Sequence, residues 1–576
     1  MHDNRQGLSR TLARWNSLFT GPLVLLAFVA GCAKKDDAAG GAYTGSWAQV
    51  ADILSRVKPP TFPDRDFNIK GYGAVGDGET DCKKAIDKAV LACCYAEGGR
   101  VVVPAGTYLI NGPIHLQSDT NLHLEEGAKI VFGTNFADYL PPALTRFAGT
   151  RIYNYSPMIY AYRKKNVAVT GKGELDAQAH DTWCAWVGKS GGSGKEVRRM
   201  NREDVPVMDR MFGEGHKLRP SMVQFFGCEN VLVEGIKIVD APAWCLHPVF
   251  SKNVTIRNIS FNSKNANNDG IDVDSCEDVH IHDVVFDNAD DCIALKSGRG
   301  PEGRKFARPT KNVYIHDCIF NSYTAIAIGS EMGGGVFNIF AENCEARSQV
   351  KRAFYIKGNR SRGGEVAHIR YRNMKFLDSR EEMLAIRTDY GTMAADELKD
   401  FPPYFHDVRW ENITASGSCK IALRIAGQED MPIEDVVLKD IRIEKADKIK
   451  EITDARNIVM QNVILAGEIQ DPNAANLPPD VYAGPDRIVD PNGDKTAVLQ
   501  GSVADDGPTG KLKYQWSVEK GDSGAVMLDN PQAIRTKAVF SKAGAYVLKL
   551  TADDGELKGS HTLTIEVMDD STRAEQ

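Results

Sequence analysis

Two short acidic clusters contain the residues of this chain that are best suited to chemistry. Residues 267–272 read Asn-Asn-Asp-Gly-Ile-Asp, and residues 288–292 read Asn-Ala-Asp-Asp-Cys. Asp269 and Asp290 are 21 positions apart, close to the interval at which the surrounding sequence repeats. In a protein of stacked coils, residues one repeat apart lie about 4.8 Å from each other, so Asp269, Asp290 and Asp291 are predicted to form one patch. Grouped carboxylates can supply the general acid and base that cleave a glycosidic bond.

A recurring pattern must position these carboxylates. A polar residue, usually Asn or Asp, is followed by Val or Ile and then by alternating apolar positions. Short strands with one apolar face cannot bury that face alone, whereas stacked coils share a core and pair every strand edge. We therefore predict an all-β chain with a parallel β-helix over residues 63–468. The copies begin at Asn166, Asn230, Asn253, Asp278, Asn312, Asn338, His368, Asp407, Asp435 and Asn457.

Two stretches interrupt or close this repeat. A Gly-rich turn at 67–81 precedes a predicted helix over about 80–96, with Thr80 or Asp81 as N-cap, and this helix would cap one end of the coil stack. The largest insertion, about 180–220, is basic and contains Trp183 and Trp186. We interpret it as a loop suited to an acidic sugar, although for any single residue a solvated loop position is the better interpretation.

The two ends of the chain differ from the repeat. A Pro-rich linker at 469–480 leads into short alternating strands at 481–570, which predict a small β-sandwich. This segment resembles the PKD-type immunoglobulin-like domains, with Trp516 as a core residue rather than a glycan-stacking one. Residues 1–31 contain a basic start and a short apolar run, as in a signal peptide. The run ends at Cys32, which resembles the acylated Cys of bacterial lipoproteins.

This N-terminal pattern predicts an exported bacterial lipoprotein at the outer membrane, the cell surface or the periplasm, with 32–62 as a tether and ordinary secretion as the alternative. The only membrane contact expected is the lipid anchor. The net charge of -7 disfavours nucleic-acid binding. No phosphate-binding Gly loop or Rossmann fingerprint occurs, so no cofactor is predicted. Because no Cys-x-x-Cys pair has zinc spacing, no metal is predicted either. Small buried side chains in a ladder are expected at Cys228, Cys276, Cys318 and Cys344.

With the acidic clusters placed on a β-helix, residues 66–465 resemble the polygalacturonase family, glycoside hydrolase family 28. Residues 267–270 correspond to its Asn-Thr-Asp-Gly motif and residues 289–291 to its Gly-Asp-Asp motif. The resemblance implies a right-handed, pectin-lyase-like β-helix. It also implies that Asp290 is the general acid and that Asp269 and Asp291 activate water for an inverting hydrolysis. Carboxylates this close cannot all ionise easily, so one pKa is expected to rise.

Two further blocks depart from the family. Residues 322–324 read Ser-Tyr-Thr where the family has Gly-His-Gly, and residues 355–357 read Tyr-Ile-Lys where it has Arg-Ile-Lys. The lost cations leave room for rhamnogalacturonan or a decorated galacturonide, and Arg352, Arg360 and Arg362 are candidates to replace the charge. The predicted substrate-binding residues are Lys357, Tyr323, Tyr355, Asn267, Arg219, His247 and Arg352.

The leading hypothesis is an exo-acting glycosidase for an acidic polysaccharide or oligosaccharide of the plant-cell-wall type. A polysaccharide lyase on the same fold is the first alternative, because Arg or Lys could remove the uronate C5 proton while acidic groups hold Ca²⁺. A non-catalytic glycan-binding lipoprotein is the second. Clustered carboxylates oppose that second alternative, since a binding protein has no need of mutually repelling charges.

Overall fold

The computed structural model describes residues 45–391, 400–470, 479–484, 486–489, 495–504, 512–555 and 557–568. The predicted signal peptide, Cys32 and most of the linker lie outside these residues. Within the described ranges, no helix is both long and apolar enough to cross a membrane.

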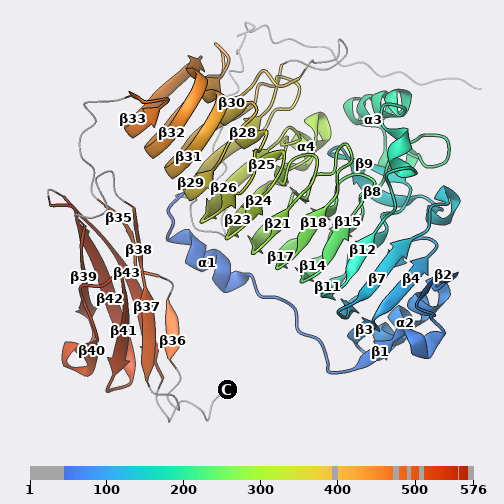
Figure 1. Ribbon diagram of the computed structural model, residues 1–576, viewed down its shortest axis with the longest axis horizontal. Coiled ribbons are helices and arrows are strands. Elements are labelled where there is room, and N and C mark those ends of the chain that lie inside the picture. The colour runs from blue at the N-terminus through green and yellow to red at the C-terminus, as the bar shows by residue number, and fades with distance from the viewer. Residues whose placement is uncertain are drawn as a thin grey trace, which may run out of the picture. The chain divides into compact units, whose positions relative to one another are not determined.

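Short parallel strands stack coil upon coil along most of the chain (Figure 1). The first stack contains β5 (Ile114–His115), β10 (Ile159–Tyr162), β13 (Val223–Phe226), β16 (Leu246–Val249), β19 (Ile271–Asp274), β22 (Ile293–Lys296), β25 (Thr324–Ile328), β28 (Arg352–Lys357) and β30 (Glu382–Arg387). The second contains β1 (Asp66–Asn68), β3 (Gly99–Val103), β6 (Thr120–Leu124), β11 (Lys165–Gly171), β14 (Glu229–Glu234), β17 (Lys252–Arg257), β20 (Glu277–His282), β23 (Thr310–His316) and β26 (Val336–Glu342). The third contains β2 (Asp77–Asp81), β4 (Gly106–Ile110), β7 (Ala128–Phe132), β12 (Glu174–Asp176), β15 (Lys237–Val239), β18 (Ser260–Asn262), β21 (Val285–Phe286), β24 (Ile319–Phe320) and β27 (Glu345–Ala346).

The last coils continue in longer strands that bend from one stack into the next. They are β29 (Glu365–Phe376), β31 (Tyr404–Ala426), β32 (Ile433–Thr453) and β33 (Ala455–Leu465), followed by β34 (Glu468–Ile469). Their apolar side chains join one continuous core with those of the earlier coils. The predicted parallel β-helix is therefore confirmed.

The polar residue that opens each repeat has a structural role. Asn312 has φ +57°, and its amide donates to Asp278 in the coil before it (3.0 Å). Asn338, also left-handed, donates in turn to Asn312 (2.8 Å). The same chain of bonds joins Asn166, Asn230 and Asn253. We call these two rows of side chains the asparagine ladder. Asn and Asp tolerate this backbone conformation and can bond the next coil, which explains the residue type at these positions.

Replacing Asn312 by Ala is expected to destabilise the β-helix by about 2–3 kcal/mol. Alanine tolerates the left-handed backbone at φ +57° less well than asparagine does, and the change also removes both ladder hydrogen bonds. Thermal unfolding of the variant measures the loss. Asn312→Gly, which loses the same bonds without the backbone strain, should fall between the variant and the parent. An Ala variant as stable as the parent would contradict the ladder's role.

The N-terminal cap forms close to the predicted place. The helix α2 spans Lys83–Tyr95, and η1 (Ile69–Tyr72) precedes it. The N-cap residue is Cys82, not Thr80 or Asp81, because β2 extends through Asp81. The Asp81 carboxylate nevertheless accepts a hydrogen bond from the Lys83 N–H (2.9 Å), which satisfies a donor of the first turn.

The structure describes residues 45–62 of the segment predicted as a tether, and we call residues 45–58 the N-terminal strap. It includes α1 (Gln49–Arg56), which contacts β20 and β23. Trp47 packs against Phe340, with ring centroids 5.3 Å apart. Arg56 forms an ion pair with the buried Asp278 (2.9 Å). The strap therefore lies across the outer face of the second stack, on the other side of the coils from α3 and α4 in Figure 1.

Several insertions lie together along one side of the coils (Figure 1). They are the hairpin β8 (Ala143–Phe147) and β9 (Thr150–Asn154), η2 (Phe136–Tyr139), η3 (Trp183–Trp186), α3 (Gly191–Arg202), η4 (Val207–Asp209) and α4 (Gly300–Phe306). The predicted loop at 180–220 thus contains a helix. Trp183 is fully buried against Phe136 and Tyr139, and Trp186 packs on Phe136. Trp183 is a packing residue of the insertion, so it is not available to stack on a sugar.

All cysteines in the described part of the chain are free thiols. Cys228, Cys276, Cys318 and Cys344 are buried at the predicted ladder positions.

The C-terminal strands form a four-stranded sheet, β36–β43–β42–β39, a three-stranded sheet, β37–β41–β40, and the pair β35–β38. Trp516 is buried in their shared core and donates to the Ala533 carbonyl (3.1 Å), which confirms it as a core residue. The strands are β35 (Asp480–Tyr482), β36 (Arg487–Val489), β37 (Thr496–Gln500), β38 (Ser502–Ala504), β39 (Lys513–Lys520), β40 (Val526–Leu528), β41 (Arg535–Phe540), β42 (Gly544–Asp553) and β43 (Lys558–Val567), with η6 at Ser523–Ala525.

Candidate active site

The two acidic clusters meet in the turns that lead into β19 and β22. These strands pair in parallel with Ile271 opposite Ile293, and the Gly270 N–H donates to the Asp291 carbonyl (2.9 Å). This register places Asp269 level with Asp291. The spacing of 21 positions had instead suggested that Asp269 lies level with Asp290. One carboxylate oxygen from each of Asp269, Asp290 and Asp291 lies within 4.8 Å of the others. The predicted patch of three carboxylates is therefore present.

Buried amides hold the two turns rigidly. The side chain of Asn268 donates to the carbonyls of Ala241 and Ala243, both at 2.9 Å. Asn288 donates to the carbonyls of Asn268 (2.9 Å) and Asp290 (2.8 Å), so it ties one acidic turn to the other. Because both side chains are fully buried and direct their N–H groups at these carbonyls, they fix the carboxylates in place without facing the solvent.

Gly270 permits this close approach of the two turns. A Cβ at Gly270 would lie 2.6 Å from the Cys292 carbonyl oxygen and 2.7 Å from the Phe286 ring. Side-chain carbon atoms do not approach other heavy atoms so closely, and the backbone of the next coil cannot move aside. The glycine after Asp269 therefore keeps this carboxylate near those of the neighbouring coil.

A lysine on a later coil pairs with one of the three carboxylates. Lys357, at the end of β28, contacts Asp291 with Nζ 2.6 Å from Oδ2. Both side chains are almost fully buried. Ion pairs of this kind hold the carboxylate ionised, since removal of the charge would leave the ammonium group without a partner.

A second lysine, Lys296, lies between the carboxylates of Asp269, Asp272 and Glu331. Its Nζ is 3.4 Å from Asp272, 3.5 Å from Glu331 and 3.8 Å from Asp269. The ammonium also lies over the Trp244 ring, 4.7 Å from its centroid. Lys296 is 3% exposed, and its ammonium group compensates negative charge that is largely buried.

These contacts divide the carboxylates into two groups. Burial, together with the charge of Asp290, raises the pKa of Asp269 well above its usual range. Burial and the charge of Asp291 likewise raise the pKa of Asp290. Burial alone would raise the pKa of Asp291 too, but Lys357 and Lys296 outweigh it and lower this pKa. Asp291 is thus the ionised member, while Asp269 and Asp290 retain protons more readily.

The carboxylates open into a cavity of about 280 Å³. Its walls come from the acidic turns, the hairpin β8–β9, the insertion before β13 and the ends of β22, β25 and β28. The same three carboxylates have the spacing of a cation site. Two ammonium groups already neutralise them, which leaves little negative charge to bind a metal. The lining residues are Thr145, Arg146, Phe147, Ala148, Asn154, Ser190, Lys217, Arg219, Pro220, Ser221, Ala243, Trp244, Asn267, Asp269, Asp290, Asp291, Lys296, Ser330, Glu331, Lys357 and Tyr390.

Three of the predicted substrate-binding residues line this cavity: Lys357, Arg219 and Asn267. Arg219 donates to Oδ1 of Asn267 (2.7 Å) and to the carbonyls of Pro242 and Ala266. Arg219 therefore braces the turn before Asp269 as well as lining the cavity.

The other four do not line this cavity. His247 is fully buried on β16, where Ser221 and Gln224 lie within hydrogen-bond distance of its Nδ1. Tyr323 accepts a hydrogen bond from Lys351 (2.7 Å).

The remaining two share a neighbourhood outside the cavity. Arg352 is paired with Glu382, and its guanidinium lies 4.4 Å from the centroid of the Tyr355 ring. Tyr355 is 5% exposed on β28. Tyr355 lies two positions before Lys357, on the same face of β28, and its ring centroid is 5.2 Å from the Lys357 Nζ, so it adjoins a residue that lines the cavity.

Several cavity residues were not predicted, above all Lys296, Glu331, Arg146, Trp244 and Tyr390. A signal existed for Lys296, because a lysine within the apolar run after Asp291 stands out in a strand of buried residues. Arg146 had no such signal. It comes from a hairpin more than a hundred residues earlier in the chain, and it bonds Asp274 (2.9 Å) only because the hairpin folds onto β19.

Comparisons with known proteins identify the family of this chain. The family model "Glycosyl hydrolases family 28" matches residues 100–462, and the model "Rhamnogalacturonase A/epimerase, pectate lyase-like" matches 67–126. A PKD-domain model matches 483–567. The exo-poly-alpha-D-galacturonosidase of Dickeya chrysanthemi is 27% identical over 399 residues, 64% of this chain and 65% of that enzyme.

Solved structures extend the likeness to the fold. The hyperthermoactive exopolygalacturonase of Thermotoga maritima is 39% identical, with a TM-score of 0.69 over 73% of this chain and 96% of that one. The family 28 exopolygalacturonase of Yersinia enterocolitica shares the fold at 22% identity, with a TM-score of 0.57 over 69% of this chain and 78% of that one. The chain is a glycosidase and belongs to glycoside hydrolase family 28.

Proposed function

We propose that this glycosidase removes galacturonic acid residues from the end of a pectin-like chain. The observation that carries the proposal is the cluster of three carboxylates, one of them paired with Lys357, in a cavity rich in cations. The Dickeya and Thermotoga relatives, an exo-poly-alpha-D-galacturonosidase and an exopolygalacturonase, support the same substrate class.

The cavity cations suit a uronic acid. Lys296 and Lys357 are engaged with carboxylates, but Arg146, Lys217 and Arg219 also line the cavity. Arg146 bonds Asp274 and Ser275 through Nη1, while its buried Nε and Nη2 have no hydrogen-bond partner within the described chain. Because these two Arg146 atoms are buried, a sugar carboxylate would meet the more exposed Lys217 and Arg219, and the guanidinium of Arg219 matches carboxylate geometry. These cations take the place of the family Arg and His that the sequence lacks.

The directions of the pKa shifts support the chemical roles that we propose for the three carboxylates. Asp290, whose pKa is raised, donates a proton to the glycosidic oxygen as the bond to the anomeric carbon breaks. Asp291, held ionised, accepts a proton from the attacking water. Asp269 stands level with Asp291 and binds the same water by hydrogen bonding. Direct attack by water gives inversion at the anomeric carbon, which is the outcome we propose.

The lyase alternative is less well supported. A lyase needs a neutral base near the uronate C5 proton. Burial alone would lower the pKa of Lys357, but Asp291 outweighs it and raises this pKa. For Lys296, Asp272 and Glu331 outweigh burial in the same way. Both lysines therefore remain charged and cannot accept a proton.

Exo action is favoured by the size of the cavity. About 280 Å³ is at the lower end for ligand sites, and side chains from two insertions contribute to its walls. A pocket of this size accommodates the end of a chain better than its middle.

Product analysis with defined galacturonan and rhamnogalacturonan oligomers tests the proposal. We expect saturated galacturonic acid from homogalacturonan oligomers, one unit at a time. Proton NMR of the first product determines the stereochemistry. This test is needed because the nearest oxygens of the three carboxylates lie within 4.8 Å of one another, whereas the carboxyl groups of inverting enzymes are usually roughly 6.5–9.5 Å apart. An initial product of retained configuration would reject the water-attack mechanism. An unsaturated product absorbing in the ultraviolet would establish a lyase.

Replacing Lys357 by Met should move the acid limb of the pH–activity profile to higher pH. Activity requires ionised Asp291, so it is lost as the pH falls through the pKa of that group. Lys357 lowers this pKa, and its removal raises it. The pH dependence of kcat/KM measures the shift. Lys351→Met is the control, because it removes a lysine that bonds Tyr323 outside the cavity, and it should leave the pH profile unchanged. An acid limb that does not move in Lys357→Met would contradict the assignment of Asp291 as the ionised base.

We also propose that the enzyme is an exported lipoprotein anchored through Cys32. The apolar run that ends at this cysteine supports the proposal. Incorporation of labelled fatty acid into the parent, but not into Cys32→Ser, is the expected result. Equal labelling of both proteins would exclude Cys32 as the anchor.

A further inference from the structure

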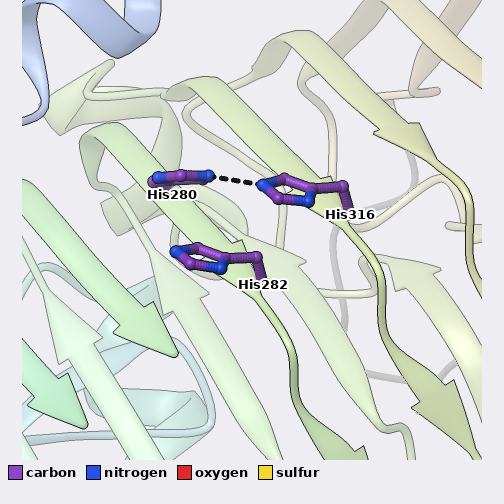
Figure 2. A group of neighbouring side chains, drawn as sticks. All are labelled: His280, His282 and His316. Atoms are coloured by element: carbon purple, nitrogen blue, oxygen red, sulfur yellow. Dashed lines mark hydrogen bonds between the residues drawn. The ribbon is translucent and has the colours of Figure 1, made fainter. Parts of the chain in front are cut away.

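Three histidines form a cluster on the outer face of the second stack, outside the cavity of the active site. His280 and His282 lie on β20, and His316 lies on β23 of the next coil (Figure 2). The two strands pair with His282 opposite His316. One ring nitrogen from each histidine lies within 4.8 Å of a ring nitrogen of the other two, and Nε2 of His280 is 2.8 Å from Nε2 of His316.

Carboxylates orient two of these rings. Nδ1 of His282 is 2.6 Å from Oδ2 of Asp283, and Nδ1 of His316 is 2.6 Å from Oδ2 of Asp317. An ionised carboxylate can only accept, so Nδ1 carries the hydrogen in both rings and each Nε2 presents a lone pair. Histidines that bind metals are held in this way, with a carboxylate on the nitrogen that does not bind.

We propose that His280, His282 and His316 bind a divalent transition-metal ion of the zinc type. Imidazole nitrogens are preferred ligands of such ions, and three of them with one open position make a common site. Zn–N bonds of about 2.0–2.1 Å in a tetrahedron place ligand nitrogens about 3.3 Å apart. The present separations, 2.8 Å and up to 4.8 Å, reach that value through small side-chain rotations. His280, which now donates from Nε2 to His316, moves that proton to Nδ1 when it binds.

The surroundings allow an ion to enter and be retained. The side chains of His282 and His316 are 15% and 18% exposed, so water and ions reach them. A cation on the neighbouring strand, Arg257, is paired with Glu234 (2.9 Å). Stacking of the parallel His282 and His316 rings, 4.8 Å apart, explains their alignment but not why each has an acidic partner.

The ion would join two successive coils at the place where the N-terminal strap crosses them. Tyr314, which stacks on His280, belongs to the apolar cluster formed by α1. Binding should therefore stabilise the coil stack without a direct effect on the glycosidase chemistry. The prediction of no metal considered only cysteine spacing. A His-x-His pair on a strand, followed one coil later by a third His, was the signal that this approach missed.

Zinc binding to the purified, chelator-treated protein tests the proposal. Calorimetric titration with Zn²⁺ should show one site, and Co²⁺ should give the visible absorption of a nitrogen-ligated, low-coordinate ion. We expect the affinity to fall by more than about 100-fold in His282→Gln and His316→Gln. The fall should be about 10–100-fold in Asp283→Asn and Asp317→Asn, because these carboxylates only orient the ligands. Circular dichroism of each variant confirms that it is folded.

His406→Gln is the matched control, since this half-buried histidine pairs with Glu365 and stacks on Tyr404 away from the cluster. Its zinc affinity should equal that of the parent. The proposal is overturned if the parent takes up no zinc at millimolar concentration, or if the His282 and His316 variants bind as well as the parent. Co²⁺ spectra typical of thiolate ligands would also overturn it, because they would assign the ion to cysteines.

Discussion

Replacing Asp290 by Asn should lower kcat on galacturonan oligomers by about 10²–10⁴-fold, the usual contribution of a general acid. The amide keeps the shape of the side chain but has no proton to give to the leaving sugar oxygen. Asp269 also has a raised pKa, but we assign it to the attacking water, which leaves Asp290 to protonate the leaving oxygen. Initial rates on a defined homogalacturonan oligomer measure the loss, with KM changed much less.

The leaving group provides a sharper test of this role. An aryl galacturonide with an acidic phenol needs little protonation, so Asp290→Asn should hydrolyse it at a rate much closer to that of the parent. Asp287→Asn is the matched control, since this residue lies on the same coil, bonds Lys264 and does not line the cavity. Equal losses on the sugar and aryl substrates would show that Asp290 has another role.

Replacing Lys296 by Met should destabilise the protein by about 3–5 kcal/mol and remove most activity. Neither carboxylate oxygen of the fully buried Asp272 has a hydrogen-bond partner among the described residues, and Lys296 is its neighbouring cation at 3.4 Å. Removing one partner of a buried pair leaves the other charge uncompensated, which is the costly case. Chemical unfolding followed by fluorescence measures the change.

The pH dependence separates charge from packing. Burial and the charge of Asp269 raise the pKa of Asp272, and loss of the Lys296 ammonium should raise this pKa further. As the pH falls, Asp272 takes up a proton and its uncompensated charge disappears. The variant should therefore recover stability relative to the parent at low pH. Lys296→Met combined with Asp272→Asn should restore much of the loss. Lys172→Met, at an exposed lysine 3.4 Å from the exposed Glu126, should cost under about 1 kcal/mol. A Lys296 variant equally destabilised at all pH values would indicate lost packing instead.

The local signals in the sequence were sufficient for the fold. Asn312 and Asn338 open their repeats because the turn needs a left-handed polar residue, and that need recurs once per coil. The same regularity predicted that Asp269, Asp290 and Asp291 lie close together. Properties that repeat with the coil could therefore be predicted.

Features that depend on insertions could not be predicted in this way. Arg146 reaches the cavity from a hairpin, and α3 forms within a stretch interpreted as a loop. His247 was predicted to bind substrate, but it is buried on β16 beside Ser221 and Gln224 from the coil before it. Where a side chain faces and what covers it are tertiary facts, and a motif alone does not contain them.

The N-terminal strap has a consequence for the order of assembly. The partners of residues 45–58 are made much later. Lys58 bonds Asn253, 195 positions on, Arg56 bonds Asp278, 222 positions on, and Gly45 accepts from Arg370, 325 positions on. Coils can add to one another as the chain emerges, since each contacts mainly its neighbours. The strap cannot complete its contacts until residue 370 has been made, so a segment that is synthesised early is among the last to reach its final place.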